Sequence, residues 1–474
     1  MKSILKVKNK QAGGVSLSQK VSFGIGSLGE VIMSNIIMCL GYGIYNLGLG
    51  VDAWMIGIAV SIPRFWDAFT DPVVGNISDN TRSRWGRRKP YILIGAILTG
   101  VFCVLLWMPP GGMGATGYFI YFMIVSILFF TTYAIFVVPF GALGFELSSD
   151  YDERTRVMAY KVFFGNLAVF CLPWAYKLCF VFGDQRDPVD GAKIVGLLYG
   201  GMIIAFGVVP AIFCKESKTI EQKKISFVKA FKYTLQNRSF LILSAAIFAM
   251  IIGFYLAFPL LLYMNVAIVC PGNDELASRY VAYSHTTYGI MGIITAPLVA
   301  WLGTRWGKRN TLMVGCAFVS LACLLSWVCF TPRYPLLQLV FCFLASPGMS
   351  CVWMLAGSSV ADICDLDELK TGLRREGMYG AVFAWLIKCG LAAVMAVGGF
   401  VLTWSKFIPK AMTQTNETIF FLKVIFAIVP VFFLIVAFLL IWKFPLTKQV
   451  VLDVQQKLKQ RKADNIDMQD LVQG

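Results

Sequence analysis

The sequence predicts an all-α integral membrane protein, and three observations lead to this class. The mean hydropathy of the chain is +0.70, 58% of its residues are apolar, and only 14% are charged. Predominantly apolar runs of about 20 residues or more recur along the chain, which is the length that crosses ~30 Å of hydrocarbon as a helix. The runs lack alternation and are too long for barrel strands, so we expect helices, which satisfy their own backbone hydrogen bonds in lipid.

Twelve membrane-spanning helices are predicted. They cover residues 21–48, 52–77, 90–109, 117–146, 157–180, 194–214, 239–265, 280–303, 311–330, 335–362, 377–403 and 418–443. The residues before the first span include lysines but no short apolar core that ends at a small-residue cleavage site. We therefore expect the first helix itself to act as the insertion signal.

Basic residues are clustered in alternate loops. The chain has 42 Lys and Arg against 26 Asp and Glu, a formal net charge of +16. The clusters lie at 2–10, 82–89, 154–156, 215–229, 305–309, 370–375 and 448–462, and the loops between them, such as LGLGVDA and PPGGMGATG, are almost free of basic residues. This asymmetry follows the positive-inside rule and predicts that both termini are cytoplasmic. Because topology accounts for the basic excess, no nucleic-acid partner is expected.

No pattern in the chain predicts a resident metal, a cofactor or a catalytic centre. The 13 cysteines form no CxxC pair, and His285 is the single histidine. The cysteines are predicted to pack as small apolar residues. Since there is also no phosphate-binding loop or catalytic triad, the sequence predicts neither an enzyme nor a cofactor-dependent protein.

The two halves of the chain repeat one plan. RWGRRK (84–89) follows the second span, and RWGKRN (305–310) follows the eighth; SSDYDERTR (148–156) and ICDLDELKTGLRR (363–375) follow the fourth and the tenth. Two matched pairs at one offset predict a parallel repeat of two six-helix bundles around a central cavity. The predicted parts are a first bundle at 1–214, a linker at 215–238, a second bundle at 239–443 and a cytoplasmic tail at 444–474.

The loops after the fourth and tenth spans carry acids followed by bases. Carboxylates at a helix end beside guanidinium groups can lock neighbouring helices together. Such a lock on the cytoplasmic side must break when the cavity opens inward. We therefore predict an inner gate made of Arg154, Asp362, Asp365, Glu368 and Arg374. The alternative is that each basic residue only anchors the inner face.

The second span carries charges where hydrocarbon is expected. Ionisable residues at the middle of a spanning helix cost roughly 2.5 to 3.5 kcal/mol each and tend to face a cavity. Arg64, Asp67 and Asp71 are three and four residues apart, so they share one helical face. Two carboxylates this close cannot both ionise freely unless a cation lies between them. The pair is predicted to carry a proton or to form half of a sodium site, to which Thr70 adds a neutral oxygen.

The eleventh span contains Lys388 in mid-helix, too deep to reach either interface easily. It requires a partner, and Asp67 and Asp71 are the best candidates. One interpretation is a static ion pair that fixes helix packing. The other is that one base and two acids exchange partners when a cation binds, which is what coupling requires.

Further polar and aromatic side chains in the spans could line a substrate cavity. Sugars are bound by carboxylates and amides, which take pairs of hydroxyls, and by aromatic faces that stack on the ring. The predicted substrate contacts are Glu30, Asn35, Arg64, Lys161 and Trp353, and Glu146 could also line the cavity. A tryptophan in a membrane helix is also commonly a packing or interface residue, so Trp353 has both interpretations.

Two long motifs resemble a known family. RFWDAFTDPVVGNISDNTRSRWGRRKPYILIG (64–95) and VADICDLDELKTGLRREGMYGAVFAWLIKCG (360–390) are similar to signatures of the glycoside-pentoside-hexuronide:cation symporters, a branch of the major facilitator superfamily. FGIGSLGE (23–30) gives weaker support. The resemblance covers essentially the whole chain and implies the major facilitator fold, with twelve transmembrane helices in two pseudo-symmetric six-helix bundles.

The resemblance also implies roles for individual residues. It makes Asp67 and Asp71 the cation-site carboxylates, with Thr70 where the melibiose permease of this family has an asparagine ligand, and it makes Lys388 the coupling lysine. It implies a sugar contact for Trp353. It places the five predicted gate residues in a cytoplasmic salt-bridge cluster.

At the positions that bind sugar in the melibiose permease, this chain departs from the family pattern. The melibiose permease has a sugar-binding aspartate in its first span and another in its fourth, and this chain has Val31 and Val137 at those positions. Its arginine in the fifth span corresponds to Val162 here. Glu30 lies next to Val31, and Lys161 lies next to Val162. Melibiose is therefore not the expected substrate, and Lys161 with fewer acids favours an anionic sugar such as a uronate or a sulfonated sugar. Loss of the asparagine ligand while both aspartates are kept favours protons over sodium.

The resulting prediction is a cation-coupled symporter that imports a sugar or glycoside by alternating access. We expect it to be a monomer surrounded by lipid in a bacterial inner membrane. One alternative is a lipid or lysolipid transporter of the same fold, which a lateral apolar opening would favour. The other is a non-transporting sugar sensor, for which the tail at 444–474 is too short to form an output domain.

Overall fold

The computed structural model describes residues 15–148, 151–183, 187–216, 233–372, 375–409 and 411–473. Within these ranges the regular structure is helical, and they contain no β-strand. The chain divides into two compact units, Met1–Gln222 and Lys223–Gly474, and each is described by itself. The predicted linker at 215–238 falls mostly outside the described residues, so the predicted domain bounds remain predictions.

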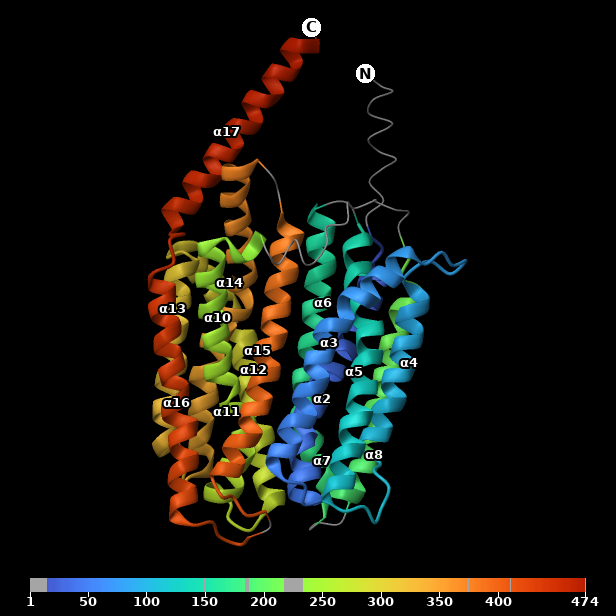
Figure 1. Ribbon diagram of the computed structural model, residues 1–474, viewed down its shortest axis with the longest axis vertical. Coiled ribbons are helices and arrows are strands. Elements are labelled where there is room, and N and C mark those ends of the chain that lie inside the picture. Colours follow the sequence, from blue (N-terminus) through green and yellow to red (C-terminus); the bar gives the residue numbers. More distant parts are fainter. Residues whose placement is uncertain are drawn as a thin grey trace. The chain divides into compact units, whose positions relative to one another are not determined.

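The first unit is a bundle of long helices (Figure 1). Its first helix passes into a π-helical segment, and a short 3₁₀ turn interrupts its fifth span. In order, the elements are α2 (Leu17–Gly41), η1 (Tyr42–Gly48), α3 (Ala53–Asn80), α4 (Lys89–Leu106), α5 (Ala115–Glu146), α6 (Tyr151–Cys171), η2 (Leu172–Trp174), α7 (Ala175–Phe182) and α8 (Pro188–Phe213).

The second unit has the same kind of architecture, and its first span also ends in a π-helical segment. A final helix, α17, extends beyond the other helices of this unit (Figure 1). In order, the elements are α10 (Arg238–Tyr255), α11 (Ala257–Met264), η3 (Asn265–Val269), α12 (Asp274–Arg305), α13 (Lys308–Cys329), η4 (Pro335–Gln338), α14 (Leu339–Thr371), α15 (Glu376–Trp404), α16 (Asn416–Trp442) and α17 (Lys448–Gln473).

Local sequence signals set several helix ends. The Asp187 carboxylate accepts a hydrogen bond from the Val189 backbone N–H at 3.0 Å, which caps α8. Asn273 caps α12 in the same way, by accepting from the Leu276 backbone N–H at 2.9 Å. Gly372 ends α14 at a φ of +73°, a left-handed conformation that favours glycine. The ends therefore follow from capping chemistry as well as from hydropathy.

Helix packing repeats from one unit to the other. Counted within each unit, the first span packs on the fifth and the sixth, the second on the fourth, and the third on the fourth and the sixth. These pairs are α2·α6, α2·α8, α3·α5, α4·α5 and α4·α8 in the first unit, and α10·α15, α10·α16, α12·α14, α13·α14 and α13·α16 in the second. The two units are therefore pseudo-symmetric bundles, as the repeated loop motifs predict.

Eleven helices of the described residues are long and apolar enough to cross a membrane. The second predicted span, α3, is not among them because its charged residues lower its hydropathy. It has 28 residues, which is ample for a crossing, and its packing on α5 matches the packing of α12 on α14. The chain is an integral membrane protein, and the count of twelve spans depends on α3.

A glycine with a positive φ precedes the third span of each unit. We call residues 84–86 and 305–307 the RWG turns. Their glycines, Gly86 and Gly307, have φ values of +104° and +85°, which side-chain-bearing residues rarely adopt. A Cβ on Gly86 would lie 2.6 Å from a carboxylate oxygen of Glu216, and a Cβ on Gly307 would lie 2.9 Å from the Cβ of Lys448. Both conformation and space therefore require glycine.

In each unit, the RWG turn or the residues directly after it form hydrogen bonds with a residue that follows the last span. The Glu216 carboxylate, just after α8, accepts hydrogen bonds from three successive backbone N–H groups at residues 87–89, at 2.8 to 2.9 Å. These groups start α4, where a helix has unsatisfied N–H donors that favour an anion. In the second unit, Lys448 Nζ donates to the Arg305 carbonyl at 3.1 Å.

Replacing Gly307 with alanine is expected to destabilise the second unit by ~1–3 kcal/mol, because alanine is strained at this φ and its Cβ would collide with Lys448. The matched control is Gly357→Ala in α14, where a Cβ would meet nothing within 4 Å and helix propensity favours alanine by up to ~1 kcal/mol. Apparent melting temperatures of the purified variants would measure the difference. An equal or higher melting temperature for Gly307→Ala than for the unsubstituted protein would contradict the argument.

Candidate functional site

The charged face of α3 is anchored to its neighbours through Arg64. The guanidinium donates a short hydrogen bond to the Ser34 carbonyl of α2 and lies 4.5 Å from the centre of the Phe130 ring of α5. A cation over an aromatic face is attracted by the ring quadrupole. The Arg64 charge therefore has polar and aromatic partners within the bundle and joins three helices of the first unit.

The two carboxylates follow Arg64 along the same helix. The Asp67 side chain is fully buried, and that of Asp71 is half-buried. The Thr70 hydroxyl donates to the Asp67 carbonyl at 3.1 Å, which leaves its oxygen lone pairs able to face a ligand. Pro72 lies inside α3 and has no backbone N–H to donate to the carbonyl of Ala68. Carboxylate, hydroxyl and carbonyl oxygens thus occur close together along one helix.

Tyr133 on α5 is a site residue that sequence reasoning missed. Its side chain is buried and lies within electrostatic range of Glu30, Arg64, Asp67 and Asp71. In the sequence it stands among aromatic and apolar neighbours, FFTTYAIF, which is also typical of packing. Charged residues of α2 and α3 therefore lie within electrostatic range of one phenol, and no spacing in the sequence signals that proximity.

Glu30 and Lys161, predicted separately as substrate contacts, form an ion pair between α2 and α6. Lys161 Nζ lies 2.9 Å from one Glu30 carboxylate oxygen and 3.1 Å from the other. The ammonium also lies 5.3 Å from the centre of the Phe140 ring. Both side chains are partly exposed, at 27% for Lys161 and 18% for Glu30, so a ligand could reach them. Locally the two charges cancel.

Asn35 is turned toward its own helix. Its amide nitrogen donates to the Val31 carbonyl at 2.9 Å and to the Ser34 hydroxyl at 2.8 Å. Ser34 also supplies the carbonyl that binds Arg64. The Asn35 amide is therefore tied to the Arg64 contact, and its nitrogen is already occupied.

In the second unit, Trp353 on α14 is 49% exposed and meets the Tyr255 ring edge to face at 6.3 Å between centroids. Such exposure leaves an aromatic face available to a ligand. Lys388 lies in mid-α15 and is half-buried. It belongs to the second unit whereas Asp67 and Asp71 belong to the first, so their pairing remains a prediction.

The structure describes the side chains of three of the five predicted gate residues, Asp362, Asp365 and Glu368. Asp362 is 6% exposed, and both of its carboxylate oxygens accept hydrogen bonds from Lys308 Nζ, at 2.7 and 2.8 Å. Asp365 and Glu368 lie half-buried on the following turns of α14. Arg374 and the side chain of Arg154 lie outside the described residues. The strong pair at Asp362 is thus a contact inside one unit.

Glu146, predicted as a possible cavity residue, has partners at the end of its helix, and its place at a cavity remains a prediction. Glu146 is the last residue of α5 and binds two bases of the first RWGRRK motif, with Arg88 Nη2 at 2.7 Å and Arg87 in a shorter contact. Arg88 also reaches Asp79 at 3.0 Å. The apolar segment of α5 ends at Glu146. This side chain therefore lies at the end of the bundle where the first RWG turn is found.

The ion pairs beside the RWG turns repeat between the units. In each, a base that follows the turn binds an acid near the C-terminal end of the fourth span: Arg87 with Glu146, and Lys308 with Asp362. A further pair joins α2 and α6 where Lys20 Nζ lies 2.7 Å from Glu153. The hydrogen bond from Lys20 lowers the pKa of Glu153 from its usual range, so this pair persists at mildly acidic pH.

Comparison with known proteins identifies relatives of the whole chain. Residues 22–448 match the family described as MFS/sugar transport protein. The "Uncharacterized symporter sll1374" of Synechocystis is 24% identical, over 94% of this chain and 97% of its own length. The "Glucuronide carrier protein homolog" of Escherichia coli is 25% identical, over 91% of this chain and 95% of its own.

Solved structures show the same fold. The crystal structure of the nucleoside transporter NupG aligns with a TM-score of 0.64 over 90% of this chain and 100% of its own. Its sequence identity is 14%. The likeness therefore concerns the arrangement of helices alone.

Proposed function

The chain belongs to the MFS/sugar transport protein family, and from this premise we propose that it is a secondary active symporter that imports a sugar or glycoside together with a cation. One observation carries the proposal: the ionisable side chains of Glu30, Arg64, Asp67 and Asp71 lie within electrostatic range of Tyr133, on helices of one bundle. Ionisable residues are rare in membrane-spanning helices and mark ion and substrate paths. The names of the relatives, a symporter and a glucuronide carrier homologue, agree with it.

The cation end of the site is Asp67, Asp71 and Thr70. Carboxylates and hydroxyls are the ligands that a hard cation such as Na⁺ takes, and carboxylates can also exchange a proton. Because Thr70 replaces an amide ligand while both acids remain, we propose that the coupling ion is a proton. Lys388 competes for the same carboxylates, so that cation binding releases it and permits the bundles to change conformation.

The sugar end of the site is Glu30, Lys161 and Trp353. Lys161 is neutralised by Glu30, at 2.9 Å. A sugar carboxylate or sulfonate would replace Glu30 at the ammonium, whereas the hydroxyls of a neutral sugar would be shared between both groups. The partial exposure of both side chains supports this role. We propose that the substrate class is an anionic sugar or its glycoside.

The expected cellular setting follows from the basic loops. We propose that the protein lies in a bacterial inner membrane with both termini in the cytoplasm, and that it works as a monomer. The inner gate of Arg154, Asp362, Asp365, Glu368 and Arg374 is part of the same proposal. Asp362 would then contribute through its bond to Lys308, which holds the cytoplasmic end of α14 in place.

Uptake into proteoliposomes tests the proposed function. Methyl glycosides of neutral sugars and of uronic acids are offered under separate inward gradients of protons and of sodium. We expect concentrative uptake of an acidic member of the panel under the proton gradient, and its collapse by a protonophore. Sodium-dependent uptake at fixed pH that a protonophore leaves intact would overturn the proton assignment. Absence of gradient-driven uptake for every glycoside would overturn symport.

A further inference from the structure

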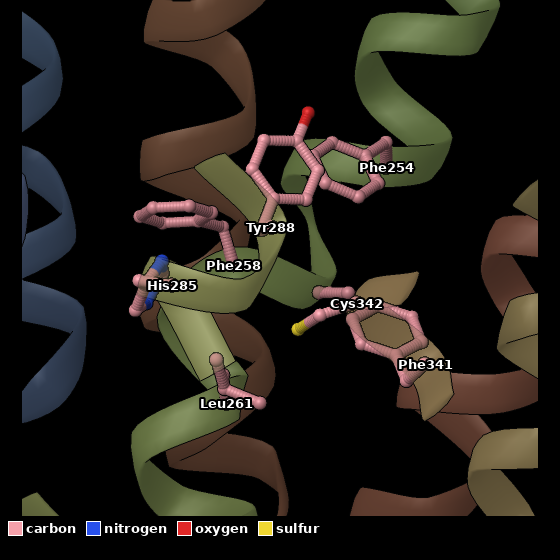
Figure 2. A pocket seen from close by; sticks show the side chains of 8 residues that line it. Phe254, Phe258, Leu261, His285, Tyr288, Phe341 and Cys342 are labelled. Atoms are coloured by element: carbon pink, nitrogen blue, oxygen red, sulfur yellow. The ribbon is translucent and has the colours of Figure 1, made fainter. Parts of the chain in front are cut away.

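A recess inside the second unit is too narrow for a ligand. It lies between α10, α11, α12 and α14, and aromatic side chains such as Phe258 and Tyr288 line it (Figure 2). The space left inside it is barely wide enough for water. A larger ligand would therefore bind at another place on this unit, and exposed side chains of a distinctive kind lie at the ends of three of its helices.

Three exposed tryptophans lie where membrane-spanning helices of the second unit end. Trp301 is near the end of α12, Trp306 follows α12 directly, and Trp442 is the last residue of α16. They are between 49% and 59% exposed. Indole rings are enriched where a membrane meets water, at the level of the lipid headgroups. These helix ends are therefore expected at that level.

Three basic side chains accompany the tryptophans, and we call the whole set the basic aromatic patch. It consists of Trp301, Arg305, Trp306, Arg309, Trp442 and Lys443. The Arg305 guanidinium lies 5.1 Å from the centre of the Trp301 ring. The Arg309 guanidinium donates a short hydrogen bond to the Trp442 carbonyl, which joins α13 to α16. Within the described part of the chain none of the three bases forms an ion pair, so the patch has an excess of positive charge.

Arg309 differs from its counterpart in the first unit, Arg88. Each is the second residue after the glycine of an RWG turn. Arg88 binds Glu146 at 2.7 Å and Asp79 at 3.0 Å. In the second unit Ala300 stands where the first has Asp79, and the acid near the end of the fourth span is bound by the lysine before Arg309. The half-buried Arg309 also has an Nε–H without a hydrogen-bond partner among the described residues, so its charge is left for an anion from outside the chain.

Exposed apolar side chains lead from the patch toward the middle of the membrane. On α12, Ile294 and Leu298 share a helical face with Trp301. On α16, Ile435 and Leu439 have the same kind of spacing before the last tryptophan, and all four apolar side chains are exposed. A phospholipid presents a charged headgroup followed by apolar chains, whereas a free phosphate ion has no apolar part. The order of groups along these helices therefore suits a lipid.

We propose that the basic aromatic patch binds the headgroup of an anionic phospholipid such as phosphatidylglycerol. Arg309 and Arg305 hold the phosphate, because a guanidinium offers paired N–H donors that match phosphate oxygens. Lys443 adds a third positive charge, which favours a lipid with a net negative charge over a zwitterionic one. The tryptophan rings lie beside the glycerol region, with the acyl chains along the exposed faces of α12 and α16.

The test measures lipid binding to the purified protein, which does not depend on transport. The delipidated protein is titrated with phosphatidylglycerol or with phosphatidylethanolamine of the same acyl chains, and native mass spectrometry gives the bound fraction. We expect phosphatidylglycerol to bind about 10-fold more tightly. Arg309→Gln should lower its affinity by about 5-fold and change phosphatidylethanolamine binding less. The matched control is Arg333→Gln, an exposed arginine over the Tyr334 ring just beyond the other end of α13, which should have no effect.

A second variant keeps the test decisive if Arg309→Gln fails to fold. The double variant Arg305→Gln with Lys443→Gln changes two exposed side chains and should lower phosphatidylglycerol affinity by about 5-fold or more. Equal binding of the two lipids by the unsubstituted protein would leave only an unselective aromatic belt and overturn the inference. An equal loss in Arg333→Gln would also overturn it. Displacement of the lipid by inorganic phosphate at the same concentration would assign the patch to free phosphate instead.

Discussion

Asp71→Asn is expected to abolish accumulation of substrate against a gradient while leaving its equilibration across the membrane. One proton carried down a tenfold concentration gradient supplies ~1.4 kcal/mol, which sustains an accumulation of about 10-fold even when it moves together with a sugar anion and no net charge crosses. Asparagine keeps the shape and neutral hydrogen bonding of the side chain but cannot carry the proton or balance a cation. Accumulation in proteoliposomes should therefore fall from that level to about one-fold, while counterflow exchange continues.

The matched control is Asp190→Asn, a carboxylate in the first turn of α8 that is 73% exposed and pairs with Lys193 at 2.7 Å. A surface pair of this kind contributes little, so accumulation should be unchanged. Concentrative uptake by Asp71→Asn, at the level of the unsubstituted protein, would show that this carboxylate does not couple the two fluxes. Loss of exchange together with accumulation would point to a structural role for Asp71.

Lys308→Met is expected to destabilise the second unit more than Asp362→Asn. Lys308 Nζ binds both Asp362 oxygens, at 2.7 and 2.8 Å, and the Ser358 carbonyl at 3.0 Å. Without the ammonium, an aspartate side chain that is 8% exposed remains buried with its charge uncompensated. Removing one partner of a fully buried pair costs roughly 3–5 kcal/mol. Because Lys308 is 29% exposed, we expect about 2 kcal/mol here.

Asp362→Asn should cost about 1 kcal/mol, since Lys308 can still reach water and the Ser358 carbonyl. The double variant Lys308→Met with Asp362→Asn should recover most of the loss, because no buried charge then remains. Unfolding of the purified variants by a denaturing detergent gives the three free energies. Equal costs for the single variants that add in the double variant would contradict a coupled pair.

Hydropathy and charge placement predict the membrane helices well. The predicted bounds of most spans lie within a few residues of the observed helix ends, because a helix in lipid ends where the apolar run ends. The π-helical segments η1 and η3 could not be predicted, because no residue type encodes the extra residue per turn. They depend on packing at the ends of the first span of each unit.

Part of the candidate site could be predicted from residue spacing, and part could not. Spacing alone is enough to put Arg64, Asp67 and Asp71 on one face of a helix. Which charges pair depends on tertiary geometry, so the Glu30–Lys161 pair and the position of Tyr133 could not be read from the sequence. The partners of Glu146 likewise depend on tertiary geometry, because Arg87 and Arg88 come from a loop about 60 residues earlier in the chain.

The hold of Glu216 on the start of α4 has a consequence for the order in which the chain is made. Three backbone N–H groups at the start of the third span donate hydrogen bonds to the carboxylate of Glu216, which follows the sixth span. During synthesis, these three hydrogen bonds can form only after Glu216, which follows the last helix of its bundle, has left the ribosome. Lys448 stands in the same position relative to the second bundle. In each half, a contact at or directly after the RWG turn thus depends on a residue that follows the sixth span, and this contact is missing until that residue has been synthesised.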